Sequence, residues 1–352
     1  MNDLLALHRN LVSIPSVSHN EGEISEFIAA HLRRSGAEVS RHGLNVIAKT
    51  AGKPRLLLNT HFDTVPPNDA WTRDPWTADV VDGRVYGLGS NDAKGCAAAM
   101  LATFCSLHDV PGLAILLSPE EETGGQGTEV AWPYLRDDLG WRPKGVIVGE
   151  PTGLQIGVWQ RGLLVLELVA EGIAGHAANT IPADNPVFKL ARDISRLEQV
   201  GLTPHARFGA PTINPTVVSG SGAKNQVPAE ARAILDIRTV PADDGFIETH
   251  EEITDLLRRT LESRVEIRSS RLKAFSCDPG SRIVQTVIDA VPGATPFASR
   301  TMSDQVWFEG FDAIKFGPGD SARSHTADEF IWESEVVAGY GAYRAVAQRF
   351  LA

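Results

Sequence analysis

The sequence has few cysteines and no cysteine motif. Its three cysteines, Cys96, Cys105 and Cys277, are an odd number at unrelated spacings and form no CxxC pair. This argues against both a disulfide framework and a thiolate zinc site. We expect all three to be small buried residues, as free cysteines usually are.

The chain also lacks long apolar runs and an excess of positive charge. No apolar run approaches the roughly 20 residues that a membrane-spanning helix needs. The residues after Met1 show none of the basic, apolar and small-residue regions of a signal peptide, so we expect a cytoplasmic protein. The net charge of −11, from 33 basic and 44 acidic residues, argues against nucleic acid and anionic membranes as partners. No GxGxxG or GxxxxGK[ST] motif follows a predicted strand, which disfavours a nucleotide-binding protein.

Apolar periodicity predicts alternating helices and short buried strands in the first 159 residues and in the last 81. Such alternation is typical of a mainly parallel sheet covered by helices on both faces. The predicted strands are 45–49, 55–59, 113–117, 145–148 and 313–316, and the predicted helices are 4–12, 23–34, 94–107, 127–135 and 333–351.

The middle of the chain follows a different pattern. Strands are predicted at 163–170, 212–218, 231–238 and 265–272, and helices at 185–197 and 246–261. The resulting β-α-β-β-α-β order is that of ferredoxin-like folds. We therefore predict a second domain at 160–271, inserted into a first domain made of 1–159 and 272–352.

Polar residues gather where the predicted strands of the first domain end or its helices begin. They are His61, Asp63, Asp92, Glu121, Glu122, Glu150 and, far downstream, His325. Because the carboxyl ends of parallel strands share one edge of a sheet, we expect these side chains to converge.

Two histidines and several carboxylates without cysteine suit Zn²⁺, Mn²⁺ or Co²⁺. Their number favours two ions about 3.5–4 Å apart that share a bridging carboxylate. Asp63 points the same way as His61 along an extended chain and could orient its ring. Each segment alone has a simpler interpretation: Asp92 as a helix cap, or 120–122 as a solvated run of charge. Only their joint position at strand ends favours a metal site.

The order of these motifs resembles a known family. His61-x-Asp63, Gly89-x-x-Asp92, Glu121-Glu122, Gly149-Glu150-Pro151-Thr152, Gly175-His176-Ala177 and the late His325 are similar to motifs of the zinc aminoacylase and exopeptidase family. That family includes acetylornithine deacetylase, succinyl-diaminopimelate desuccinylase and glutamate carboxypeptidase. The resemblance covers nearly the whole chain. It implies an α/β fold, with a mainly parallel-sheet di-zinc catalytic domain and an inserted ferredoxin-like (βαββαβ) lid and dimerisation domain.

The resemblance also implies roles for the residues at the strand ends. His61 and Glu150 would bind one metal ion, Glu122 and His325 the other, and Asp92 would bridge them, with a cis peptide bond to Ala93. Asp63 would orient His61, and Glu121 would be the general base and proton shuttle. Zinc is the default ion, with cobalt or manganese possible.

The inserted domain resembles the lid of the family. His176 matches the histidine that reaches the active site of the neighbouring subunit and polarises the scissile carbonyl, which implies a homodimer. Asn225 and Arg238 match lid residues that contact the substrate. Arg323 is a candidate for binding the substrate α-carboxylate, and Asp304 or Asp320 could meet a cationic side chain.

The expected activity is metal-dependent removal of an N-acyl group from an amino acid. The segments 68–76, 87–92, 301–304 and 317–330 look closest to the acetylornithine deacetylase-like branch, so acetylornithine, an intermediate of arginine biosynthesis, is the first expectation. Acetylcitrulline, succinylornithine, carrier-linked lysine or ornithine, and succinyl-diaminopimelate remain alternatives. A dipeptidase or carboxypeptidase is a rival on the same scaffold. A non-catalytic binding protein is a further rival, but it would be expected to have lost ligands, and every ligand position here is filled.

Overall fold

The computed structural model describes residues 2–179, 181, 184–220, 223–242 and 247–352. The chain forms two compact units. The first comprises Met1–Val158, Cys277–Phe297 and Ser303–Ala352, and the second comprises Trp159–Ser276 and Ala298–Met302. The inserted unit thus ends at 276 where 271 was predicted, and it includes a short downstream segment that the sequence pattern did not indicate.

A nine-stranded sheet lies mostly within the residues of the first unit. Its order is β1 (Val39–His42), β2 (Asn45–Lys49), β6 (Leu113–Ser118), β3 (Leu56–His61), β7 (Gly145–Val148), β17 (Ala313–Lys315), β8 (Ile156–Gln160) and β15 (Phe275–Ser276), with β16 (Pro296–Ser299) also paired to β8. The four central strands β6, β3, β7 and β17 run parallel, and the flanking pairs are antiparallel. β3, β6 and β7 are buried along their whole length, as expected of parallel strands covered on both faces. The predicted mainly parallel α/β sheet is confirmed.

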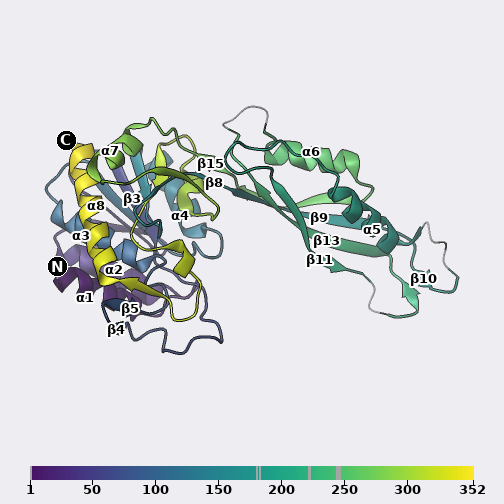
Figure 1. The fold of residues 1–352 in the computed structure, drawn as a ribbon, viewed down its shortest axis with the longest axis horizontal. Helices are drawn as coiled ribbons and strands as arrows, with labels where there is room; N and C mark the ends of the chain where they lie inside the picture. Colours follow the sequence, from purple (N-terminus) through teal and green to yellow (C-terminus); the bar gives the residue numbers. More distant parts are fainter. Residues whose placement is uncertain (1, 180, 182–183, 221–222, 243–246) are drawn as a thin grey trace. The chain divides into compact units, whose positions relative to one another are not determined.

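The helices of this unit are α1 (Asn2–Val12), α2 (Gly22–Arg34), α3 (Lys94–Ser106), α4 (Gln126–Pro133), α7 (Arg282–Ala290) and α8 (Glu333–Leu351). The Ala-rich α3 is buried almost all round and packs against both α1 and α8. Figure 1 shows α8, in yellow, beside α3. Small side chains on α3 allow this close packing. Because α3 is held on both sides, the start of the helix, and with it the end of the preceding loop, has a fixed position.

A separate three-stranded sheet was not predicted. It has the order β18 (Phe330–Trp332), β5 (Arg84–Tyr86) and β4 (Val80–Val81). Because β18 pairs with a strand more than 240 residues earlier, it holds the segment after His325 next to the loop that leads into α3.

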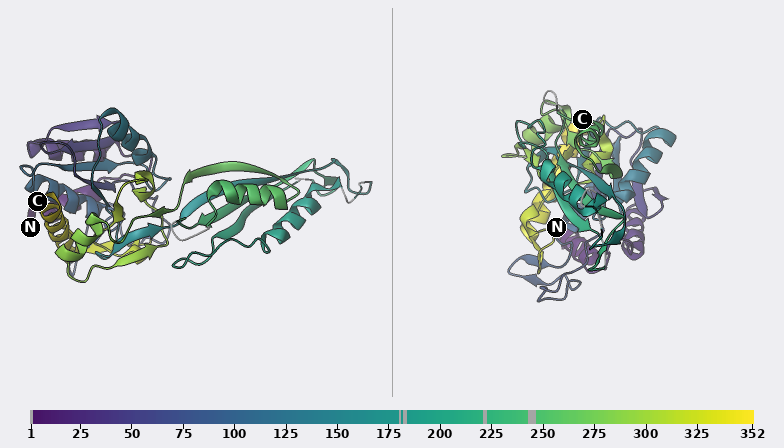
Figure 2. Two further views of the ribbon diagram at one scale, coloured as in Figure 1. Left: turned by 90° about the horizontal axis from the view of Figure 1, so that it is seen from above. Right: turned by 90° about the vertical axis from the view of Figure 1, so that its right-hand side faces the viewer.

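The second unit has the β-α-β-β-α-β order predicted from the sequence. Its elements are β9 (Gly162–Glu171), α5 (Pro186–Leu197), β11 (Thr212–Ser219), β13 (Glu230–Thr239), α6 (His250–Thr260) and β14 (Arg264–Leu272), and a short ladder joins β10 (Gly175–His176) to β12 (Gln226–Val227). The sheet order is β11-β13-β9-β14 and all pairs are antiparallel. Both helices cover one face of this sheet (Figure 2), where Leu190 and Leu257 join Leu166 and Leu235 in a buried core. Residue 246, the predicted start of α6, lies outside the described residues.

Among the described residues, no helix combines the length and apolar character needed to cross a bilayer. All three cysteines are free; Cys96 and Cys277 are buried, and Cys105 is half-buried.

Candidate metal centre

His61 is the last residue of β3 and is almost completely buried. Its Nδ1 lies 3.3 Å from Oδ1 of Asp63, and its Nε2 lies 3.3 Å from Oδ1 of Asp92. Burial opposes the charged form, but the hydrogen bonds with the two aspartates raise the pKa of His61 well above its usual value. Asp63 thus holds one ring nitrogen and directs the other toward Asp92. Carboxylates often orient metal-binding histidines in this way, by bonding the ring nitrogen that does not bind the metal.

Asp63 also holds the segment that carries the glutamate pair. It accepts the backbone N–H groups of Glu121 at 3.1 Å and Glu122 at 3.2 Å, and the hydroxyl of Ser18 at 2.7 Å. Burial would raise the pKa of Asp63, but the hydrogen bond and charge of His61 outweigh it, and the pKa is lowered. One buried carboxylate therefore fixes both the histidine and the start of the glutamate turn.

Asp92 lies in the loop before α3, and its peptide bond to Ala93 is cis, as the resemblance implies. Its two carboxylate oxygens face different histidines: Oδ1 faces His61, and Oδ2 lies 3.9 Å from Nε2 of His325. In the described chain, the N-cap of α3 is Ala93, without a side-chain capping bond, so the helix-cap interpretation of Asp92 is wrong.

Glu122 and His325 form the other side of the cluster. Nε2 of His325 lies 3.0 Å from Oε1 of Glu122, and this contact is the main cause that raises the pKa of His325 to about 9. Potential ligand atoms of His61, Asp92 and Glu122 lie within 4.8 Å of one another. The side chains that the sequence placed at separate strand ends therefore meet.

Glu121 and Glu150 add two more carboxyl groups. Burial raises the pKa of Glu121 well above its usual value. The charge of His61 opposes this increase, and the charge of Glu150 adds to it. Burial, and next the charge of Asp92, raise the pKa of Glu150 to about 8. Acidic groups crowded at one buried site repel one another, and nearby cations would relieve that repulsion.

Glu329 supports the centre and was missed by the sequence analysis. Its buried carboxylate accepts the backbone N–H groups of Gly89 at 3.0 Å and of Asn91 and Asp92 at 2.9 Å each. Burial raises the pKa of Glu329 to about 7, and the charge of Asp92 adds to this effect. The only signal in the sequence was its place in the distinctive segment 317–330.

Asn91 ties the same loop to the segment that carries His325. Its side-chain amide donates to the carbonyl of Asp320 at 3.1 Å and accepts the N–H of the same residue at 3.0 Å. His325 itself has a left-handed backbone with φ of 60°. This conformation is uncommon for a residue other than glycine, and residues that adopt it cluster at functional sites.

The donor set fits divalent metal ions. It offers imidazole nitrogens and carboxylate oxygens, buried and mutually close, which is the ligand chemistry of zinc, cobalt and manganese centres. His61, Asp92, Glu122, Glu150 and His325 are the residues that would hold them.

The predicted lid residues belong to the second unit. His176 pairs with Gln226 in the β10–β12 ladder, and the carbonyl of Asn225 accepts the N–H of Ala177 at 2.9 Å. His176 and Asn225 are therefore neighbours, and both are exposed. Arg238, on β13, forms a two-pronged ion pair with Asp236 at 2.8 and 3.0 Å.

Three other candidates have protein partners. Arg323 makes a two-pronged ion pair with Glu335 at 2.7 and 2.8 Å. Asp304 is buried and bonds the hydroxyl of Thr128 at 2.5 Å, and Asp320 accepts the N–H of Ala322 at 2.9 Å as a cap. Glu335 therefore occupies the guanidinium of Arg323, whereas Asp304 and Asp320 each use one carboxylate oxygen in these bonds.

Comparisons with curated proteins place the chain among amide hydrolases. It is 33% identical over 322 residues to a succinyl-diaminopimelate desuccinylase from Cereibacter sphaeroides, covering 84% of each chain. It is 28% identical over 366 residues to an acetylornithine deacetylase from Klebsiella pneumoniae, covering 93% of this chain and 92% of that protein.

Solved structures share the whole fold. An M20 family metallo-carboxypeptidase from Sulfolobus solfataricus matches with a TM-score of 0.79 and 19% identity over 100% of both chains. A dinuclear metal-binding peptidase of the M20 family from Bacillus subtilis matches with a TM-score of 0.74 and 17% identity, covering 99% of this chain and 98% of that one. The sequence pattern described as peptidase family M20/M25/M40 spans residues 57–349. The chain therefore belongs to peptidase family M20/M25/M40 and is a metallohydrolase of that family.

Proposed function

We propose that this enzyme uses two divalent metal ions, zinc first among them, to hydrolyse the amide bond of an N-acyl amino acid. The observation that carries the proposal is the convergence of His61, Asp92, Glu122 and His325 beside Glu121 and Glu150. Bound there, the ions would polarise the acyl carbonyl and lower the pKa of water.

The positions of the side chains support an allocation of ligands. His61 and Glu150 would hold one ion, and Glu122 and His325 the other. Asp92 is suited to bridge because its two oxygens face the two histidines.

Glu121 is the proposed general base. A carboxyl group with a raised pKa is matched to proton transfer near neutral pH. It would take a proton from the attacking water and give it to the departing amine. Its backbone N–H is bonded to Asp63, so the residue that orients His61 also positions the base.

His176 is proposed to stabilise the negative charge that develops on the carbonyl oxygen. Its Nδ1 accepts the N–H of Ala178 at 3.2 Å, so the neutral ring carries its proton on Nε2. That N–H is a donor of the kind that oxyanion stabilisation requires. Asn225, beside it, and Arg238 are proposed substrate contacts, although Arg238 would have to exchange Asp236 for a substrate carboxylate. Arg323 is the proposed contact for the substrate α-carboxylate on the same condition, since it would have to exchange Glu335 for that carboxylate.

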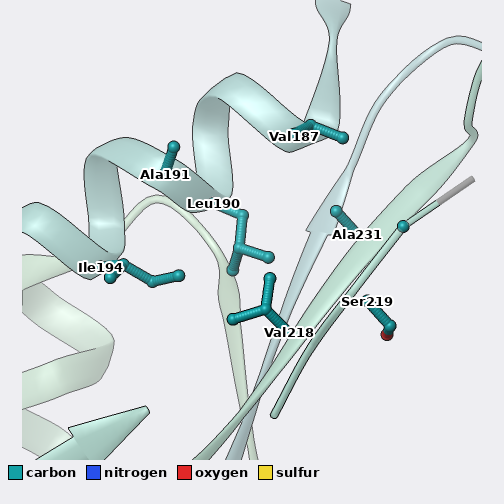
Figure 3. Close-up of a pocket in the computed structure, with 8 residues that line it drawn as sticks. Val187, Leu190, Ala191, Ile194, Val218, Ser219 and Ala231 are labelled. Carbon is teal, nitrogen blue, oxygen red and sulfur yellow. The ribbon is translucent and has the colours of Figure 1, made fainter. Parts of the chain in front are cut away.

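A homodimer through the second unit is part of the proposal. Its edge strand β11 and helix α5 expose apolar side chains: Val187, Phe188, Val217 and Val218 are 43–62% exposed. Figure 3 shows Val187, Leu190 and Ile194 of α5 facing Val218 and Ala231 across a groove. Within the described residues, β11 pairs on one side only, and such an edge beside an apolar groove is suited to association with a second chain. By the family resemblance, His176 would act in the active site of the neighbouring subunit.

The substrate is proposed to be N-acetylornithine, with acetylcitrulline, succinylornithine, carrier-linked lysine or ornithine, and succinyl-diaminopimelate as alternatives. The relatives of about 30% identity include both desuccinylases and an acetylornithine deacetylase, so they support the class more strongly than the acyl group. The test is to assay metal-loaded enzyme on acetylornithine, acetylcitrulline, succinylornithine, succinyl-diaminopimelate and a dipeptide side by side. The highest kcat/KM on acetylornithine is expected, and preference for the dipeptide would overturn the proposal.

A further inference from the structure

The segment between α1 and α2, residues 16–21, lies beside the residues that follow β3 and has no place in the mechanism above. Val17 and Thr64 form a parallel bridge. The N–H of Thr64 donates to the carbonyl of Ser16 at 2.9 Å, and the N–H of Ser18 donates to the carbonyl of Thr64 at 3.1 Å. The segment is therefore fixed to the chain just beyond the end of β3.

Glu21 ends this segment and is completely buried. Its Oε1 accepts the backbone N–H of Glu120 at 3.1 Å, although the two residues are 99 positions apart. A fully buried glutamate is rare without a partner. Burial raises the pKa of Glu21, and a protonated carboxyl group still has an oxygen that can accept this N–H. The contact thus needs an acceptor oxygen at residue 21 and does not depend on a full negative charge.

The chain turns at Glu120, two residues after β6, and the backbone there is left-handed, with φ of 59°. This region is unfavourable for residues other than glycine, so surrounding contacts must hold it. Three consecutive N–H groups of the turn end on buried carboxylates. Glu21 accepts the first, and Asp63 accepts those of Glu121 and Glu122. The two carboxylates together fix the backbone of the turn.

We propose that Glu21 is a positioning residue for the general base, because it holds the left-handed backbone of Glu120. The direction of the Glu121 side chain depends on the backbone dihedral angles of the residue before it. A turn that relaxes at residue 120 would therefore move the carboxyl group of Glu121 from its place in the cluster. The inference rests on the proposed function, since it concerns the base assigned there.

Steady-state kinetics of the zinc-loaded enzyme test this role, with acetylornithine or whichever compound of the panel above is hydrolysed fastest. Glu21→Met keeps the length of the side chain but removes the acceptor. It should lower kcat by about 10-fold to 100-fold, as misplacement of a catalytic group by about 1 Å does, and leave KM and zinc affinity within about threefold of wild type. Glu21→Gln keeps an acceptor oxygen and should retain kcat within about threefold. Glu23→Met, at an exposed position on α2, is the matched control.

Further substitutions separate positioning from a general loss of stability. Glycine adopts the left-handed region without steric cost, so Glu120→Gly should leave the wild type nearly unchanged. In the Glu21→Met background, the same change should raise kcat by about threefold or more. In a Glu121→Gln background, Glu21→Met should have little further effect, because the base that Glu21 positions is gone.

The opposing results are distinct. If Glu21→Met keeps kcat within about twofold of wild type, or if Glu21→Gln loses as much as Glu21→Met, the role of Glu21 is overturned. Failure of Glu120→Gly to raise the kcat of Glu21→Met overturns it as well. If Glu21→Met folds poorly, as judged by circular dichroism, Glu21→Leu takes its place as the variant without an acceptor, with the same criteria. If zinc-loaded wild type hydrolyses none of the compounds, the proposed function itself fails, and the inference fails with it.

Discussion

Single carboxylates do more than one task in this centre. Asp63 holds the ring of His61 and the N–H groups of Glu121 and Glu122, so His61 and the proposed base, Glu121, are positioned together. The sequence predicted this neighbourhood because His61 and Asp63 are two residues apart. It could not predict the role of Glu329, because that carboxylate binds backbone N–H groups 237–240 residues away and leaves no side-chain pattern.

Replacement of Glu121 by glutamine should leave metal affinity nearly unchanged and reduce kcat by about 100-fold to 10,000-fold, because the amide cannot accept the water proton. Steady-state kinetics with parallel metal analysis measure both. Glu120→Gln is the matched control and should stay near wild type, since Glu120 contacts His19 rather than the cluster. If Glu120→Gln reduces kcat more than Glu121→Gln does, the base has been assigned to the wrong glutamate.

Replacement of Glu329 by glutamine should weaken metal binding by about 10-fold to 100-fold. The carboxylate of Glu329 accepts three backbone N–H groups of the Asp92 loop, and the amide nitrogen of glutamine cannot accept a hydrogen bond from them. Chelator competition gives the affinity, and excess metal should restore much of the activity. Glu309→Gln, at an exposed position in the same unit, is the control. Unchanged affinity in the Glu329 variant would show that the carboxylate does not hold the Asp92 loop.

At the scale of elements, the ends of neighbouring parallel strands bring the site together. β3, β6, β7 and β17 were predicted from short apolar runs, and their polar continuations mark the edge of the sheet. β4, β5 and β18 were not predicted, because such short strands carry little periodicity, and β18 depends on β5, a partner far along the chain. β18 directly follows Glu329 and is held by its pairing with β5, so the sequence analysis missed Glu329 and this sheet for the same reason: both depend on contacts between distant segments.

His8 joins α1 to the loop before α3, and its buried ring should make the free energy of unfolding fall at acidic pH. Burial, opposed by the hydrogen bond with the carbonyl of Ser90 at 2.9 Å, lowers the pKa of His8 to about 4. The unfolded chain binds the proton more tightly, so stability from this group is complete above about pH 6.5 and falls as the pH drops toward 4.

The loss attributable to His8 should reach about 3 kcal/mol at pH 4. Urea unfolding of metal-free protein between pH 7.5 and 4 measures it, and His8→Gln should show a shallower decline over this window. Parallel curves for the two proteins would mean that His8 does not remain neutral in the fold.

At the scale of the whole molecule, the proposed functional residues are divided between two units. The first holds the proposed metal ligands and the proposed base, and the second holds His176, Asn225 and Arg238. The βαββαβ pattern of the second unit was readable from its own periodicity. Whether His176 serves its own chain or its partner depends on assembly, which periodicity does not encode.

A mixed dimer of Glu121→Gln and His176→Ala chains decides this point. If His176 acts in the neighbouring subunit, one of the two sites contains both Glu121 and His176, and a purified heterodimer should regain about half of the wild-type activity. Each homodimer should be nearly inactive. A heterodimer as inactive as its parents would place His176 in the site of its own chain.

The metal centre is tested most directly by anomalous diffraction at the zinc edge from crystals soaked with Zn²⁺. Two peaks about 3.5–4 Å apart are predicted. Asp92 should lie between them, with His61 and Glu150 at one peak and Glu122 and His325 at the other. The absence of anomalous density at these five side chains, or zinc bound only elsewhere, would contradict the account.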